Sequence, residues 1–354
     1  MQIPRHALAK KPSPRLSLWL LFVYFLFIVY ASLSPFTGWR VPAFGFSDVL
    51  QQPLLQTYTG FDALLNVVSY IPLGLLLGLT LRARLGALAS LLLACFLGLA
   101  LSASMEFLQM YLPSRTSSNL DLLTNASGTF LGVLLALSFI RWTGLYEALA
   151  HRREQIFRQG KTMDFGLALL ALWMFGQCNP SLPMLGNVFI SALEHQPFAA
   201  MKSNPFDAWE CVAVALNLLM LGGLLLTLLR NKNQVIQILL AVLASVALLK
   251  FITAAVLLKS SAMLLWVNSE AMLGILLGSV LLFAMRALAL TQLLRVASIV
   301  SLAYLLVAHG ILDSGTPAAA MSIYHWHYGH LLNYNGLAQT ITLVFPLLLL
   351  LHLW

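Results

Sequence analysis

A group of polar residues interrupts an otherwise apolar sequence within Met105–Gly132. Glu106 and Gln109 close one hydrophobic run, and Asp121 and Asn125 open the next. Polar groups stranded in hydrocarbon are costly, so such residues usually pair, face water or protein, and mark functional sites. The side chains fit two kinds of chemistry: binding of a polar or cationic group, and proton transfer between paired carboxylates.

Three further residues extend this group. Asp62 and Asn66 are four residues apart, on one helix face at the start of an upstream run, and Arg115 is the nearby cation. Three carboxylates against one guanidinium are unbalanced, so either one carboxyl holds a proton or an exogenous cation or polar substrate completes the site. The expected ligand-binding residues are Asp62, Asn66, Glu106, Gln109, Arg115, Asp121 and Asn125.

A purely structural explanation of the same residues stays open. Asp121 follows Ser117, Ser118 and Asn119, so it can occupy the first turn of a helix, where a carboxylate favours the positive end of the dipole. Arg115 can then be a simple partner for Glu106.

The composition identifies a polytopic membrane protein. The chain has 354 residues, of which 60% are hydrophobic and 9% charged, whereas a soluble protein has roughly 25% charged residues. The net charge of +8 comes from basic residues that flank apolar runs, which favours membrane orientation over nucleic-acid binding.

The hydrophobic runs predict an all-α membrane helix bundle of about ten transmembrane helices. They lie at about residues 16–34, 62–81, 86–110, 120–140, 163–177, 209–229, 235–258, 262–285, 293–312 and 336–354. With the N-terminus inside, fifteen of the 20 Lys and Arg residues fall on the cytoplasmic side. This bias predicts that both termini are cytoplasmic and that the polar turn at Arg115 faces outward.

The expected domains are a basic cytoplasmic N-terminus (1–15), a four-helix membrane unit (16–142), a basic cytoplasmic linker (143–162) and a second helical region (163–354). The linker is amphipathic, so we expect it to lie along the anionic inner leaflet. A shift of about 145 residues sets Phe61-Asp62-Ala63 on Phe206-Asp207-Ala208 and Gly128 near Gly274. The second region is therefore a candidate degenerate repeat that has lost most of the polar set.

Small residues spaced by four predict close helix packing. Gly74 and Gly78 lie in the second expected helix, and Gly128 and Gly132 lie in the fourth. We expect these two helices to pack through the glycine faces, which would draw Asp62 towards the other carboxylates.

These motifs resemble the VanZ-like membrane proteins over about residues 16–142. The resemblance rests on Glu106-x-x-Gln109, Pro113-x-Arg115, Asp121-x-x-x-Asn125-x-x-Gly128-x-x-x-Gly132, and the upstream Asp62-x-x-x-Asn66 with Pro72-x-Gly74. It implies a multi-pass protein of the bacterial inner (cytoplasmic) membrane. The family is named for a protein linked to low-level resistance to teicoplanin, and no agreed biochemical activity accompanies the name.

The leading functional hypothesis is an outward-facing polar pocket that binds, or affects the handling of, a cell-wall, lipid-linked or glycan component. One alternative is a membrane enzyme in which Glu106 and Asp121 are the catalytic candidates for a glycosidic or phosphate bond. A transporter is a third possibility, although the inner halves of these helices show few polar residues. Membrane lipids and a lipid-linked or cell-wall precursor are the expected partners; the sequence does not indicate the oligomeric state.

Two other features carry weaker signals. His325, His327 and His330 lie among aromatic residues in an outer loop, where they can bind a metal, although an interfacial role is favoured. Cys178 and Cys211 can form a disulfide if both face an oxidising side. No nucleotide-binding, zincin or nucleophile-elbow motif is present, so no cofactor is expected.

Overall fold

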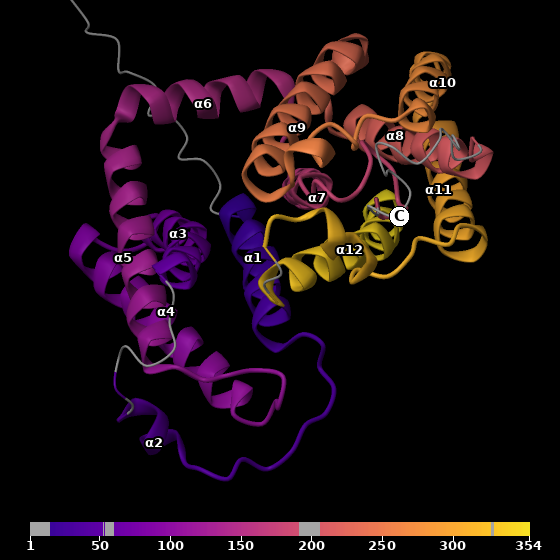
Figure 1. Ribbon diagram of the computed structural model, residues 1–354. Coiled ribbons are helices and arrows are strands. Elements are labelled where there is room, and N and C mark those ends of the chain that lie inside the picture. The colour runs from indigo at the N-terminus through magenta and orange to yellow at the C-terminus, as the bar shows by residue number, and fades with distance from the viewer. Residues whose placement is uncertain (1–14, 52, 54–59, 191–205, 327–328) are drawn as a thin grey trace, which may run out of the picture. The chain divides into compact units, whose positions relative to one another are not determined.

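The computed structural model describes residues 15–51, 53, 60–190, 206–326 and 329–354, and Figure 1 shows that these residues are mainly helical. Within them there is no β-strand, only isolated bridges, so the predicted all-α architecture is confirmed. The helices are α1 (Arg15–Leu33), α2 (Phe46–Leu50), α3 (Gly60–Arg82), α4 (Ala87–Gln109), α5 (Asn119–Arg141), α6 (Thr143–Ile156), α7 (Lys161–Gln177), α8 (Ala208–Leu228), α9 (Val235–Leu257), α10 (Ser269–Met285), α11 (Leu290–Leu306) and α12 (Gly329–Leu353).

Among the described residues, eight helices are long and apolar enough to cross a membrane: α1, α3, α4, α5, α8, α9, α11 and α12. The chain is therefore a multi-pass membrane protein. The other two expected spans correspond to α7 and α10, which have 17 residues each. The expected span from Ala262 is shortened because α10 begins only after its N-cap Asn268, whose side chain accepts a hydrogen bond from the Ala271 N–H at 2.8 Å. The orientation of the termini stays a prediction.

The chain divides into two compact units. Unit 1 comprises residues up to Phe25 and Gly38–Gln155, and unit 2 comprises Leu26–Thr37 and Ile156–Trp354. The division at Gln155 falls inside the segment expected to be a linker. Residues 26–33 of α1 group with unit 2, where Phe27 stacks on Phe175 of α7 with ring centroids 4.3 Å apart. The expected domain bounds stay a prediction.

In unit 1, α3 and α5 form the most extensive helix–helix contact. A Cβ atom at Gly74 would collide with the backbone carbonyl of Thr129, and one at Gly128 would collide with that of Val67. Gly78 lies so close to Ala136 that an added Cβ would be 2.7 Å from the alanine methyl. Since the contacting residue numbers rise together along both helices, α3 and α5 are parallel, with their N-termini at the same end.

In unit 2, α8 is the central helix. The apolar stretch of α8 is 89% buried, and it is contacted by α7, α9, α10, α11 and α12. A helix that is apolar on all sides is stable in this position because every face meets another helix.

The glycine contacts between α8 and α10 follow the register of those between α3 and α5. A step of 144 residues takes the α3 positions to α8, and a step of 146 takes the α5 positions to α10. The contact of Gly128 with Val67 corresponds to that of Gly274 with Cys211. Likewise, Gly132 with Ile71 corresponds to Gly278 with Ala215, and Gly78 with Ala136 corresponds to Gly222 with Leu282. A helix pair with the same order of contacts thus occurs in each unit.

Candidate functional site

The seven predicted site residues lie at one end of unit 1. Asp62 and Asn66 occupy the first two turns of α3, and Asp121 and Asn125 occupy the first two turns of the parallel α5. α4 runs antiparallel to α5, because contacts pair its late residues with early α5 residues, such as Ser102 with Asn125. The remaining three site residues are Glu106 and Gln109 at the end of α4 and Arg115 in the turn before α5.

Glu106 lies at the base of this group and is only 2% exposed. Its Oε2 accepts a hydrogen bond from the Ser118 N–H at 2.8 Å, and its backbone carbonyl accepts one from the Ser117 hydroxyl at 2.7 Å. Ser118 is the N-cap of α5, so the carboxylate sits at the positive end of that helix. Glu106 therefore fastens the end of α4 to the start of α5.

Asn125 is the second buried polar residue of the group. Its Nδ2 donates to the Ser102 hydroxyl at 2.9 Å, and its backbone carbonyl accepts from Thr129 Oγ1 at 2.9 Å. Its side-chain Oδ1 is buried, and no described residue donates a hydrogen bond to it. Buried acceptors are almost always satisfied, so this atom has capacity for a water molecule or a ligand N–H or O–H group.

Tyr70 of α3 brings a phenol to the same place. Its hydroxyl is within electrostatic range of Glu106 and lies near Ser102, but it forms no well-aligned hydrogen bond with a described residue. The predicted site did not include Tyr70, Ser102, Ser117 and Ser118, because Ser and Tyr are common in membrane helices. Their spacing from Glu106 and Asn125 is the signal that identifies them: Ser102 is one helical turn before Glu106.

The other five predicted residues form a half-buried rim: Asp62, Asn66, Gln109, Arg115 and Asp121. Each takes part in a noncovalent interaction, so none is an isolated polar group. Partial burial lowers the pKa of Arg115, but a guanidinium stays charged at any physiological pH. The rim thus combines one fixed positive charge with carboxyl and amide groups.

A short segment before α3 packs beside the rim. Phe46 of α2 meets Phe107 edge to face at 5.9 Å, and the Arg40 N–H donates to the Tyr111 carbonyl at 2.9 Å. The side chain of Asn119 also donates to the Leu50 carbonyl at 3.3 Å. These contacts attach the segment to the loop that carries Arg115, a neighbour that the sequence did not predict.

The part of the chain that carries the polar group matches a known protein family. The family model of VanZ/LLP1 matches residues 14–141. Residues 14–141 are a VanZ-like domain. The resemblance seen in the sequence is confirmed, and the matched range contains α1 to α5 and every residue of the polar group. Searches of curated proteins and of solved structures found no match.

Outside the VanZ-like domain, the weak metal-ligand candidates His325, His327 and His330 stay a prediction. His325 is exposed, whereas His327 and the side chain of His330 lie outside the described residues. Within the described part of the chain, no three His, Cys, Asp or Glu residues are placed to hold a metal ion. The three cysteines are free, so the possible Cys178–Cys211 disulfide is not formed.

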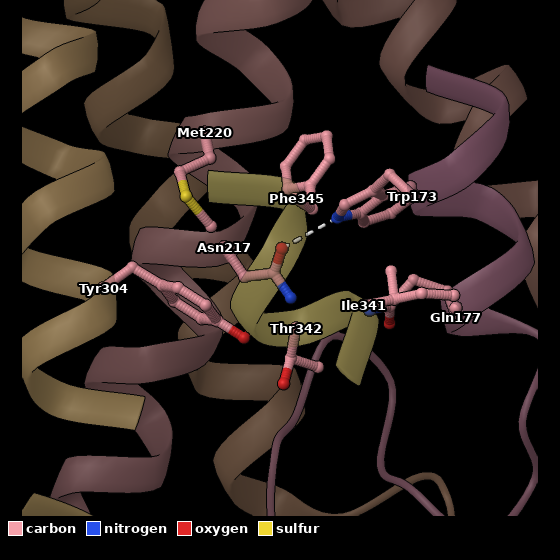
Figure 2. Close-up of a pocket in the computed structure, with 9 residues that line it drawn as sticks. Trp173, Gln177, Asn217, Met220, Tyr304, Ile341, Thr342 and Phe345 are labelled. Carbon is pink, nitrogen blue, oxygen red and sulfur yellow. Dashed lines mark hydrogen bonds between the residues drawn. The ribbon is translucent and has the colours of Figure 1, made fainter. Parts of the chain in front are cut away.

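Unit 2 contains a buried polar network that the sequence did not predict (Figure 2). Trp173 Nε1 donates to Asn217 Oδ1 at 2.8 Å, and Asn217 Nδ2 donates to the Leu185 carbonyl at 2.9 Å. Gln177 accepts from the Leu185 N–H at 2.9 Å. The signal for Asn217 was an amide in the middle of an apolar run.

A small cavity is lined by Trp173, Gln177 and Asn217 of this network, together with Tyr304 and Thr342 (Figure 2). It has room for about one water molecule. The side-chain amides of Asn217 and Gln177 already form hydrogen bonds, so we interpret the cavity as part of the core of unit 2. The VanZ-like domain carries the better candidate site.

Proposed function

We propose that the VanZ-like domain binds a polar component of the bacterial cell envelope at the end of unit 1 that carries Arg115. The basic residues at the opposite helix ends favour an outward position for this end, in the inner membrane. The observation that carries the proposal is the joint placement of the rim around two buried side chains, one of which, Asn125, retains an unfilled acceptor.

The chemistry of the rim defines the class of ligand. Arg115 offers a forked pair of N–H donors that fits a phosphate or carboxylate, as in a lipid-linked cell-wall precursor. Asn66 and Gln109 offer neutral hydrogen bonds of the kind that glycan hydroxyls use. Asp62 and Asp121 fit amino or hydroxyl groups.

The position of Glu106 favours binding over acid–base catalysis. A catalytic acid has to reach the reacting atom, whereas this carboxylate is buried and bonded to the backbone of Ser118. We assign Glu106 a positioning role and leave ligand contact to the rim.

The test is binding of a lipid-linked peptidoglycan precursor to the full chain in nanodiscs, measured by titration. Arg115→Ala should weaken binding at least about tenfold, because a hydrogen bond to a charged group contributes roughly 1.5–3 kcal/mol. The matched control is Arg84→Ala, an exposed arginine in the loop between α3 and α4 at the other end of the unit, which should bind like the wild type. Equal binding by the Arg115→Ala variant and the wild type would refute the proposal.

A further inference from the structure

Helix α6 carries its apolar and basic residues on one side and its acidic residues on the other. At 3.6 residues per turn, Leu145, Leu149 and Ile156 fall on one face. Arg152 and Arg153 fall on the two borders of that face. The opposite face holds Glu147, His151, Glu154 and Gln155.

Most of the apolar face is uncovered in the structure, although Ile156 at its end is half-buried. Leu149 is 53% exposed, Leu145 is 42% exposed, and Trp142, at the junction with α5, is 72% exposed. The edge-to-face contact of Tyr146 with Phe139 of α5, at 5.7 Å, fixes only the start of α6. Among the described helices, none packs extensively along it.

The position of α6 in the chain places it at the membrane boundary. It follows directly on the membrane-spanning α5, which ends at Arg141 (Figure 1). Further basic residues, Arg158 and Lys161, follow it. Tryptophan and arginine are the residues that sit at such a boundary, because an apolar body enters the lipid while the polar tip stays in water.

We propose that α6 docks on an anionic phospholipid surface, with Leu145 and Leu149 in the lipid and Arg152 and Arg153 on the headgroups. The opposite placement of Glu147 and Glu154 keeps like charge away from the lipid phosphates. This surface lies at the other end of α5 from the proposed binding site, and it does not depend on that function.

Depth measurement on the full chain tests the docking. In a background with all three native cysteines changed to alanine, Leu149→Cys and His151→Cys are each labelled with an environment-sensitive fluorophore and placed in nanodiscs. A probe at position 149 should shift to the blue and be quenched by lipids that carry a nitroxide on the acyl chain. A probe at position 151, on the opposite face, should do neither.

Charge substitutions test the headgroup. The blue shift at position 149 should be larger with phosphatidylglycerol than with phosphatidylcholine alone, and Arg152→Gln with Arg153→Gln should remove that difference. The matched pair Glu147→Gln with Glu154→Gln should keep it, and each variant is compared only where it elutes as the wild type does on gel filtration. Equal signals at positions 149 and 151 would overturn the proposal, as would an unchanged lipid preference without the arginines. If the blue shift at position 149 instead increases with protein concentration, a second copy of the chain covers the face, and the proposal is overturned.

Discussion

At the scale of single residues, the candidate site separates into side chains that hold the helices and side chains that are left for a ligand. Glu106, Ser117 and Ser118 join α4 to α5 through hydrogen bonds of 2.7 to 2.8 Å. Asn125 joins the same helices through Ser102 but keeps one acceptor unfilled.

The cap formed by Glu106 predicts a difference between two substitutions. Glu106→Ala removes the acceptor of a buried N–H, so the free energy of unfolding should fall by about 1–3 kcal/mol. Glu106→Gln keeps an oxygen that can accept from Ser118, so the loss should stay below about 1 kcal/mol. Unfolding in mixed micelles, followed by circular dichroism, measures both; Ser104→Ala, an exposed position on α4, is the control. Equal losses for the two substitutions would show that the negative charge, not the hydrogen bond, is what matters.

At the scale of helices, glycine sets how closely the chain can pack. Where Gly132 faces the Ile71 carbonyl on α3, there is no room for a methyl group. At Gly278, the corresponding position of α10, a Cβ would stand 3.1 Å from the Ala215 carbonyl, so the second pair is slightly looser.

This difference predicts graded effects. Gly132→Ala should lower the free energy of unfolding by about 1–3 kcal/mol through overpacking, and Gly278→Ala should lower it by less. Gly144→Ala, in the exposed α6 with no neighbour within 4 Å, should be neutral or stabilising. Thermal unfolding of the three variants in detergent gives the order. If the Gly132→Ala variant has the same melting temperature as the wild type, α3 and α5 are not packed as closely as described.

The sequence predicted what depends on local pattern. Apolar runs located the spans, and the spacing of Asp121 and Asn125 placed them on one face of α5. It did not predict that α10 starts at Ser269, because only the capping geometry of Asn268 decides that boundary. Nor did it predict the bonds between Trp173 and Asn217, since residues 44 positions apart meet only through tertiary packing.

At the scale of the whole molecule, the two units share a helix pair but differ in what surrounds it. Four of the six buried positions of α4 fall on buried positions of α9 when the chain is shifted by 148 residues, which sets Ser102 on Lys250 and Glu106 on Ala254. This shift differs from the 144 and 146 residues that relate the other helices, so the repeat stays a prediction; in this alignment the counterpart of Glu106 is apolar. We therefore propose one binding site per chain, in the VanZ-like domain.

Lys250 offers a test of how unit 2 is held together. Its Nζ is fully buried and donates to the carbonyls of Gln177 at 2.8 Å and Asn179 at 2.7 Å, at the end of α7. Lys250→Met leaves both carbonyls without this donor, so the melting temperature of the full chain in detergent should fall. The melting temperature of the Lys250→Arg variant should fall by less, because arginine still offers N–H donors. A higher melting temperature for Lys250→Met would mean that desolvation of the ammonium outweighs its hydrogen bonds.

The same contact has a consequence for biosynthesis. A lysine near the centre of a membrane helix costs about 2.5–3.5 kcal/mol on insertion. The carbonyls of Gln177 and Asn179 leave the ribosome before Lys250 does, so its acceptors are already at the membrane when α9 arrives. The order in which the helices are translated thus supplies a partner for the ammonium, and a rearranged gene that encodes α9 before α7 would insert it alone.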